Sequence, residues 1–127
     1  MQARVLETDY AQYFVEDNIM TITYATNLVI SLDIAKKLVE DRIQFSKGVT
    51  MPILVDIRGL ASVDTLSRKY FVSPRALENT MSGALLVESM ISKLAGNIYI
   101  TVDKPAVPMK LFTNKDKAIA WLKKFKK

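Results

Sequence analysis

The stretch from Met51 to Ser67 reads MPILVDIRGLASVDTLS and decides how the rest of the chain is interpreted. It opens with a short apolar run that ends at Asp56, and a loop then carries a second acid, Asp64, followed at once by Thr65. An apolar run of this length predicts a strand that is buried on both faces. The loop after such a strand is where an α/β sheet usually presents its working surface. The stretch therefore predicts a sheet whose carboxyl edge carries a polar loop and the start of a helix.

The length and composition predict one globular domain that spans residues 1–127. Half of the residues are hydrophobic, which is enough to build a core without disulfides or metal. No stretch approaches the roughly twenty apolar residues of a membrane-spanning helix. The first ten residues lack the apolar centre of a signal peptide. We therefore expect a cytoplasmic protein without a membrane span.

The chain contains neither cysteine nor histidine. Without cysteine it has no disulfides, thiol nucleophiles or thiolate ligands. Without histidine it lacks the commonest metal ligand and the usual general base near neutral pH. Asp56 and Asp64 alone make a poor magnesium site. These absences favour a protein that is not an enzyme and that holds neither a metal nor a cofactor.

The net charge of +5 comes from one end of the chain. Residues 1–114 carry twelve basic and twelve acidic side chains, whereas residues 115–127 carry six lysines and one acid. Lysines at the end of a final helix stabilise the negative end of its dipole. A nucleic-acid partner needs a basic stripe across a face, so the distribution argues against one. The apolar residues of that helix are better explained by packing on the sheet than by a membrane surface.

The first half of the chain predicts a hairpin and a helix. Two antiparallel strands are expected within residues 10–24, joined by a tight turn at Asp17-Asn18. Ser31 then offers an N-cap, and the helix is expected to end near residue 47, before Gly48. The apolar face of this helix is predicted from Ile34, Leu38, Ile43 and Phe45.

The second half begins with the central strand, expected over Met51–Ile57. Asp64 is expected to cap a short helix that runs to about Val72. Ser73-Pro74 then predicts the start of another helix, because serine is a good cap and proline suits the first helical position.

Two strands and two helices are expected in the remaining residues. Ala84–Val87 and Met109–Phe112 are short apolar runs that predict strands. Ser89–Val102 fits a helical face, but its second half alternates like a strand; its length and the need for a crossover favour a helix. A capping box at Thr113 and Asp116 predicts the last helix. Its apolar stripe consists of Ala118, Trp121, Leu122 and Phe125.

The expected order is strand, strand, helix, strand, helix, strand, helix, strand, helix. Right-handed crossovers place successive helices on the same side when strands are added in one direction. The fold class is therefore α/β: one small mixed sheet, with an N-terminal antiparallel hairpin plus parallel strands, and helices mainly on one face.

Three segments resemble the STAS superfamily, the anti-sigma-factor-antagonist-like domains, and especially its small SpoIIAA-like branch. They read ILVDIRGLASVDTLS at 53–67, GALLVES at 83–89 and MKLFTNKDKAIAWLKKF at 109–125. In this branch the chain commonly closes with a strand ending in Phe, a turn, and an Ala-x-x-Trp-Leu helix. The matching residues here are Phe112, Asn114, Ala118, Trp121 and Leu122. The resemblance implies a STAS-like fold over most of the chain.

The resemblance also implies a candidate regulatory site. In antagonist-type members the loop after the central strand holds an Asp followed by a phosphorylatable Ser or Thr, eight to nine residues beyond the strand's own Asp. Asp56, Asp64 and Thr65 match that spacing. The family usually continues Ser-Gly-Leu, whereas residues 66–68 here are Leu-Ser-Arg, which makes access of a kinase to the helix start less certain.

The phosphate acceptors predicted in this way are Thr65 and the nearby Ser62 and Ser67. A phosphate at a helix N-terminus is stabilised by free N–H groups, and its charge beside Asp64 would repel an acidic partner. The plainer interpretation is that Asp64 only caps the helix and Thr65 is an ordinary first-turn residue.

Aromatic residues are concentrated in the predicted hairpin. Two strands cannot bury aromatic side chains on both faces unless something covers the far side. Either the hairpin packs on a helix, or it forms a self-association surface, which predicts a homodimer. The residues of this possible self-association surface are Tyr10, Tyr13, Phe14 and Tyr24.

These features lead to three hypotheses about function. The first is a non-enzymatic, STAS-like module that binds another protein, with phosphorylation in the loop after the central strand as its control. The second is a small carrier that holds an apolar or lipid-like ligand between sheet and helices, lined in part by Met81, Met90 and Met109. The third is an enzyme that uses carboxylates and lysines alone, which would need three or more ionisable groups converging in one pocket.

Overall fold

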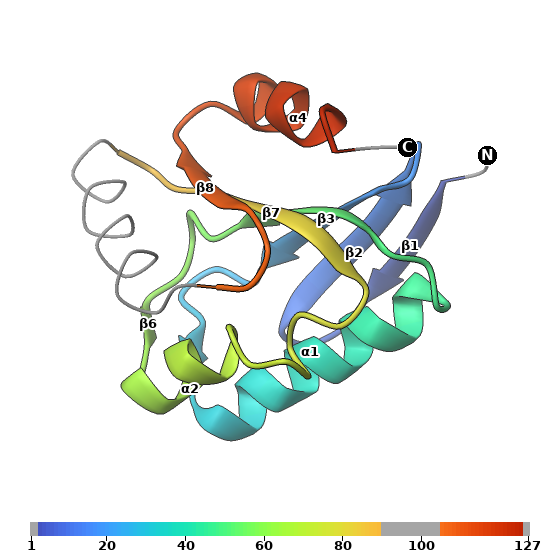
Figure 1. Ribbon diagram of the computed structural model, residues 1–127. Coiled ribbons are helices and arrows are strands. Elements are labelled where there is room, and N and C mark those ends of the chain that lie inside the picture. The colour runs from blue at the N-terminus through green and yellow to red at the C-terminus, as the bar shows by residue number, and fades with distance from the viewer. Residues whose placement is uncertain (1–2, 90–104, 126–127) are drawn as a thin grey trace.

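The computed structural model describes residues 3–89 and 105–125, and its centre is a six-stranded sheet (Figure 1). The strands are β1 (Arg4–Glu7), β2 (Ala11–Glu16), β3 (Ile19–Tyr24), β4 (Val29–Ile30), β5 (Met51–Asp56), β6 (Ser62–Val63), β7 (Thr80–Leu86) and β8 (Met109–Phe112). The helices are α1 (Leu32–Ser46), α2 (Thr65–Tyr70) and α4 (Lys115–Lys123). The sheet has the order β1-β2-β3-β5-β7-β8, and β4 pairs with β6 in a separate small ladder.

The sheet is mixed, as the sequence predicts. β1, β2 and β3 run antiparallel, whereas β3, β5, β7 and β8 run parallel. The hairpin between β2 and β3 turns at Asp17 and Asn18, whose φ angles are 56° and 60°. Positive φ at both central residues is what a type I′ turn requires. The predicted fold class and the predicted hairpin turn are both confirmed.

Helices cover both faces of the sheet (Figure 1). α1 and α2 lie on one face, where α1 packs against β2 and β4, and α4 lies on the opposite face against β5, β7 and β8. We call these the α1 face and the α4 face. Two of the three helices in the described part of the chain therefore share a face, and α4, the most C-terminal, is the exception.

The central strand β5 contributes to a separate apolar core on each face. Met51 and Ile53 belong to the core under α1, together with Tyr13 and Leu38. Leu54 belongs to the core under α4. Successive side chains of a strand point to opposite faces, so a strand covered on both sides must be apolar throughout. The predicted burial of β5 from two directions is confirmed.

β1 was not predicted from the sequence. It is a four-residue edge strand paired with β2, and its side chains alternate between half-buried and exposed. Arg4 fixes it to α1: its Nη1 donates to the Phe45 carbonyl at 2.9 Å, and its guanidinium lies 4.8 Å from the centre of the Phe45 ring. A strand this short has no periodicity of its own to detect, because its stability comes from its partners.

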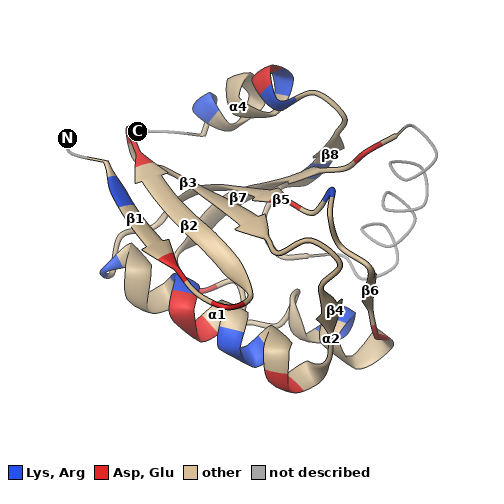
Figure 2. Cartoon of the chain, turned by 180° about the vertical axis from the view of Figure 1, so that it is seen from behind, with Lys and Arg blue, Asp and Glu red and all other residues tan. Residues whose placement is uncertain are grey.

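The buried face of α1 differs from the predicted one. Among the predicted apolar residues only Leu38 is buried, and Ile34, Ile43 and Phe45 are half-buried. The residues that α1 buries are Ala35, Leu38, Val39, Arg42 and Ser46. The outer part of the helix carries interleaved acidic and basic residues (Figure 2), including the Lys37–Asp41 pair at 2.7 Å. The buried face is thus rotated from the predicted one and includes a charged residue.

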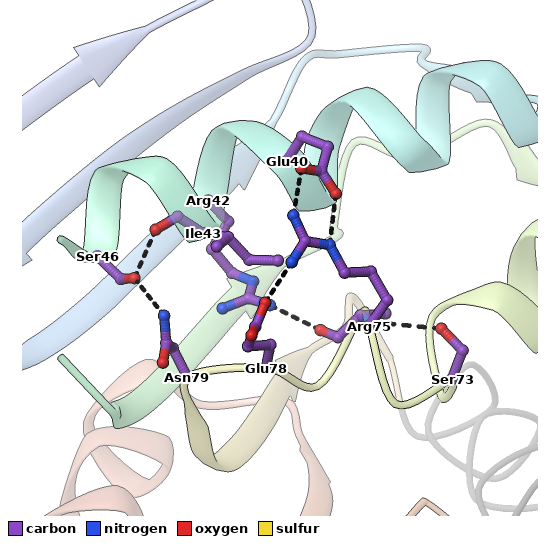
Figure 3. A network of polar contacts seen from close by, with 9 residues as sticks. Glu40, Arg42, Ile43, Ser46, Ser73, Arg75, Glu78 and Asn79 are labelled. Atoms are coloured by element: carbon purple, nitrogen blue, oxygen red, sulfur yellow. Dashed lines mark hydrogen bonds and ion pairs between the residues drawn. The ribbon is translucent and has the colours of Figure 1, made fainter. Parts of the chain in front are cut away.

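The prediction of a helix from Ser73 onward is wrong. Residues 71–79 form turns, with one helical turn closed by the Leu77 N–H to the Ser73 carbonyl. Side chains bind this segment to α1 (Figure 3). The Arg75 Nε and Nη2 atoms donate to the two Glu40 carboxylate oxygens at 2.8 and 2.5 Å. Arg75 also forms an ion pair with Glu78, within the same segment. These contacts with α1 favour turns over a continued helix in the short connection to β7.

Two further expectations concern the C-terminal half. α4 is capped by Asn114, whose Oδ1 accepts from the Lys117 N–H at 3.0 Å, so the cap lies one residue after the predicted Thr113. Met109–Phe112 forms β8 as predicted. The predicted helix over Ser89–Val102 lies almost entirely outside the described residues.

The β2–β3 turn offers a test of the hairpin. We expect Asn18→Val to lower the free energy of unfolding by about 1–2 kcal/mol, because a β-branched residue resists positive φ. Asn18→Gly is the matched control and should unfold at a urea concentration close to that of the wild type. Equal unfolding midpoints for the valine and glycine variants would contradict the turn conformation.

Candidate functional site

The loop after β5 is held in place by a ladder that the sequence did not predict. β4 and β6 pair in parallel, with Ile30 opposite Val63. The Asn27 N–H donates to the Gly59 carbonyl at 2.7 Å, and a Cβ at Gly59 would lie 3.2 Å from the Thr26 Cα. This close backbone approach ties the loop after β5 to the segment before α1. The edge at the carboxyl ends of β3, β5, β7 and β8 is therefore ordered around these two loops.

Asp56, at the end of β5, binds Arg58 in the same loop. The Arg58 Nη2 and Nε atoms lie 2.8 and 3.0 Å from the two carboxylate oxygens, and the Arg58 N–H donates to one of them. Burial raises the pKa of Asp56, but the hydrogen bonds from Arg58 outweigh it and leave the pKa below its ordinary value. The Asp56 carboxylate therefore binds the loop that follows β5.

Asp64 caps α2, and Thr65 follows it on the surface. The Asp64 Oδ1 accepts from the Ser67 N–H at 2.8 Å, and hydrogen bonding by Ser67 lowers the pKa of Asp64. Thr65 and Ser62 are exposed, and Leu66 is 65% exposed beside them. Ser67 is completely buried, so its hydroxyl is not accessible to a kinase in this conformation. Of the predicted acceptors, Thr65 and Ser62 are accessible.

The two predicted acids are not brought together. Asp56 occupies a β5 position that points to the α4 face, and the charge of Lys115 in α4 contributes to its lowered pKa. Asp64 begins α2, which lies on the α1 face (Figure 1). Each carboxylate binds its own local donor. The loop therefore presents two separate capping acids, not one paired-carboxylate site.

A cavity of about 510 Å³ opens on the α1 face of the sheet. It lies between the sheet and the residues that connect α1, α2 and β7. Most of its lining is apolar, and it runs beneath the four neighbouring parallel strands β3, β5, β7 and β8. Apolar residues that line it include Ile22, Ile53, Val55, Ile57, Leu60, Val63, Phe71, Val72, Leu85 and Leu111.

The sequence located this cavity between sheet and helices but misplaced part of its lining. Of the three methionines expected there, Met109 lines the cavity and Met90 lies outside the described residues. Met81 falls in a register shift between β5 and β7, where Met51 pairs with Thr80 but Pro52 pairs with Ser82. Such a bulge shifts the alternation of side chains, which the sequence pattern does not reveal.

Several polar groups also line the cavity. The Tyr13 hydroxyl donates to the Leu38 carbonyl at 3.1 Å. Burial raises the pKa of Tyr13 and of Tyr24 well above the ordinary value, so both rings stay neutral. Arg42 is 5% exposed, and burial lowers its pKa, an effect that Tyr13, Tyr24 and Glu78 partly oppose. Arginine nevertheless remains charged in proteins.

Sequence reasoning missed Arg42 as a site residue. The spacing of Ala35, Leu38, Val39, Arg42 and Ser46 repeats every three to four residues, which is the pattern of one helical face. The signal in the sequence is that Arg42 is the one charged residue on a stripe of small or apolar residues. The predicted face was centred on Ile34 and Ile43, so it did not include Arg42.

The hairpin aromatics are placed mainly in the interior. Tyr13 is fully buried, its ring 6.2 Å from that of Phe45 in α1, and Tyr10 and Tyr24 are half-buried against the same core. Packing on a helix, the first of the two predicted alternatives, accounts for these three. Phe14 points to the other face of the sheet, opposite the exposed Val5. Self-association through the hairpin stays a prediction and would rely on that face.

Among the residues that the structure describes, no three acidic residues come together as metal ligands would. No helix within the described ranges is both long enough and apolar enough to span a bilayer.

The sheet order, the flanking helices and the loop after β5 define a SpoIIAA-like α/β protein. Residues 13–126 match the family model described as a domain of unknown function (DUF7793), and the chain belongs to that family. The comparison with curated proteins gives no match.

Among solved structures, the chain is similar to an uncharacterized protein of the DUF3478 family from Shewanella loihica PV-4, described as having a SpoIIAA-like fold. The identity is 13%, the TM-score is 0.60, and the match covers 95% of this chain and 92% of that chain. At this identity the similarity concerns the fold alone. It confirms the predicted SpoIIAA-like resemblance, and neither match indicates an enzyme family.

The Asp56–Arg58 pair predicts how acid affects stability. Because the folded-state pKa of Asp56 is lowered, its contribution is present above the unfolded-state pKa and is lost as pH falls through the folded-state value. We expect the unfolding free energy of Asp56→Asn to fall less steeply than that of the wild type below about pH 4. Urea unfolding at several pH values measures this. Arg58→Met should flatten the curve in the same way, and parallel curves for all three proteins would contradict the effect.

Proposed function

We propose that this protein is a non-enzymatic binding module and that the cavity on the α1 face is its ligand site. The supporting observation is the size and apolar lining of this 510 Å³ space. Small-molecule sites typically enclose about 300–1,000 Å³ with mainly apolar walls. The function that fits best is that of a small carrier for an apolar or lipid-like ligand.

The ionisable groups around the cavity favour binding over catalysis. Six of its lining residues are ionisable, which meets the number expected of an enzyme that lacks histidine and cysteine. General acid–base catalysis also needs a pKa near the working pH. Burial raises the pKa of Tyr13 and Tyr24, which both line the cavity, and so moves both pKa values further from neutral pH. The proposal therefore assigns no catalytic residue.

Filling the cavity should abolish ligand binding. The probe is N-phenyl-1-naphthylamine, a neutral apolar dye whose fluorescence rises in apolar sites. We expect saturable binding to the wild type, weakened at least about tenfold by Val63→Trp, because Val63 lines the cavity and an indole would occupy it. Val29→Trp is the matched control, since Val29 lies on the adjacent strand β4, is 60% exposed and does not line the cavity.

Two results would contradict the ligand site. One is the absence of saturable dye binding to the folded wild-type protein. The other is an equal loss of binding in the two tryptophan variants, because that would place the dye on the surface near β4 and β6.

A second candidate function is a regulatory contact with another protein at the start of α2. It is supported by the exposure of Thr65 and Ser62 next to Leu66, an apolar side chain that is 65% exposed. A phosphate on Thr65 would add charge beside Asp64 at this apolar contact. This is the arrangement that the resemblance to anti-sigma-factor antagonists implies, with phosphorylation acting as the switch.

Charge at Thr65 should then control partner binding. We expect Thr65→Glu to reduce recovery of a co-purifying protein at least about tenfold in quantitative affinity purification from the native cell. Thr50→Glu, at an exposed threonine before β5 at the opposite edge of the sheet, is the control and should leave recovery unchanged. Identical partner profiles for the two variants, with no phosphate detected on the loop, would contradict the regulatory contact.

A further inference from the structure

Arg42 is a buried cation on the wall of the cavity. It is 5% exposed, although arginine is almost never fully buried without a partner. Its Nη2 donates to the Ala76 carbonyl at 2.6 Å, whereas Nη1 has no hydrogen-bond partner among the residues that the structure describes. Figure 3 shows the guanidinium between α1 and the turn that precedes β7. One arm of the guanidinium is therefore fixed and the other is unused.

The acidic residues around Arg42 are bound to other cations. Glu40 and Glu78 both bind Arg75, which crosses from the turn to α1 (Figure 3). Asp41 binds Lys37 at 2.7 Å through one carboxylate oxygen. No carboxylate within the described ranges forms an ion pair with Arg42. Its single hydrogen bond is to a neutral carbonyl, so the charge of Glu78 acts on it only without direct contact.

The cavity wall carries two further arginines. Arg58 and Arg68 also line the cavity, and Glu88 is the one acid among its described lining residues. Arg58 is already bound to Asp56, so its charge is balanced locally. A buried charge is stable only when it is paired or hydrogen-bonded. A ligand with an anionic group and an apolar body would pair with the buried charge of Arg42 and also fill the apolar space.

On the basis of the ligand site proposed above, we propose that the ligand is an apolar carboxylate whose head group binds the guanidinium of Arg42. Its hydrocarbon part would lie against the strand residues Ile53, Val55 and Leu85. A carboxylate accepts charge-assisted hydrogen bonds from a guanidinium and matches its planar geometry. Tyr13 and Tyr24 are neutral and bring no competing negative charge to Arg42.

Three ligands of equal chain length test the head group on the wild-type protein. Dodecanoate, 1-dodecanol and dodecylamine are each used to displace N-phenyl-1-naphthylamine. Hydrogen bonds to a charged group are strong enough to change affinity at least about tenfold. We therefore expect dodecanoate to displace the dye at a concentration at least about tenfold lower than dodecanol, and dodecylamine to be the weakest.

Two variants assign the effect to Arg42. Arg42→Met keeps the length and apolar stem of the side chain but removes the charge, and should make dodecanoate and dodecanol equivalent while dye binding persists. Replacing an unpaired buried charge by an apolar residue is often tolerated, so the variant is expected to fold. Arg58→Met, which removes a lining arginine already bound to Asp56, should keep the preference for dodecanoate.

The outcomes distinguish a wrong inference about the carboxylate head group from a wrong assignment of the ligand site. Dye binding with equal displacement by dodecanoate and dodecanol would overturn the carboxylate inference and leave the ligand site standing. No dye binding would overturn the ligand site. If Arg42→Met fails to fold, the wild-type series alone decides. A preference for dodecanoate that survives in folded Arg42→Met but is lost in Arg58→Met would assign the head group to the edge of the sheet and overturn the role of Arg42.

Discussion

The structure depends on the burial of β5 from both faces. Ile53 lies in the core under α1, and Leu54, the next residue, lies in the core under α4. Removing either layer would expose a row of large apolar side chains, at a cost of about 25 cal/mol for each Å² returned to water. The parallel arrangement of β3, β5, β7 and β8 requires this burial, because parallel sheets occur almost only with both faces covered. The carboxyl ends of these strands therefore meet at one edge.

The two faces are filled differently, and this difference creates the site. On the α4 face, residues such as Leu86, Phe112 and Leu122 form a closed core. On the α1 face, α1 packs against β2 and β4, and the cavity extends beneath β5, β7 and β8. On this face the half-buried side chains of Val55 and Leu85 line the cavity.

The polar network around α1 explains why a charged residue lies in this space. Arg75 connects Glu40 with Glu78 and so holds the turn before β7 against the helix (Figure 3). That turn delivers the Ala76 carbonyl to Arg42 and encloses its guanidinium. The neighbouring acids are engaged by Arg75 and Lys37, so Arg42 keeps an unused donor. The same contacts that close the cavity wall thus leave a positive group on it.

The sequence by itself determined the mixed sheet, the Asp17-Asn18 turn, the buried β5 and the helix start at Asp64, because each depends on a local pattern: period two, turn chemistry or a cap. It did not reveal β1, the β4–β6 ladder or the turns at 71–79, each of which is stabilised in part by contacts outside its own segment. Only the tertiary structure decided that Asp56 and Asp64 lie on opposite sides of the sheet, and that Arg42 is buried at a cavity. These placements depend on which helices and turns pack against each face of the sheet, and local sequence patterns do not specify that packing.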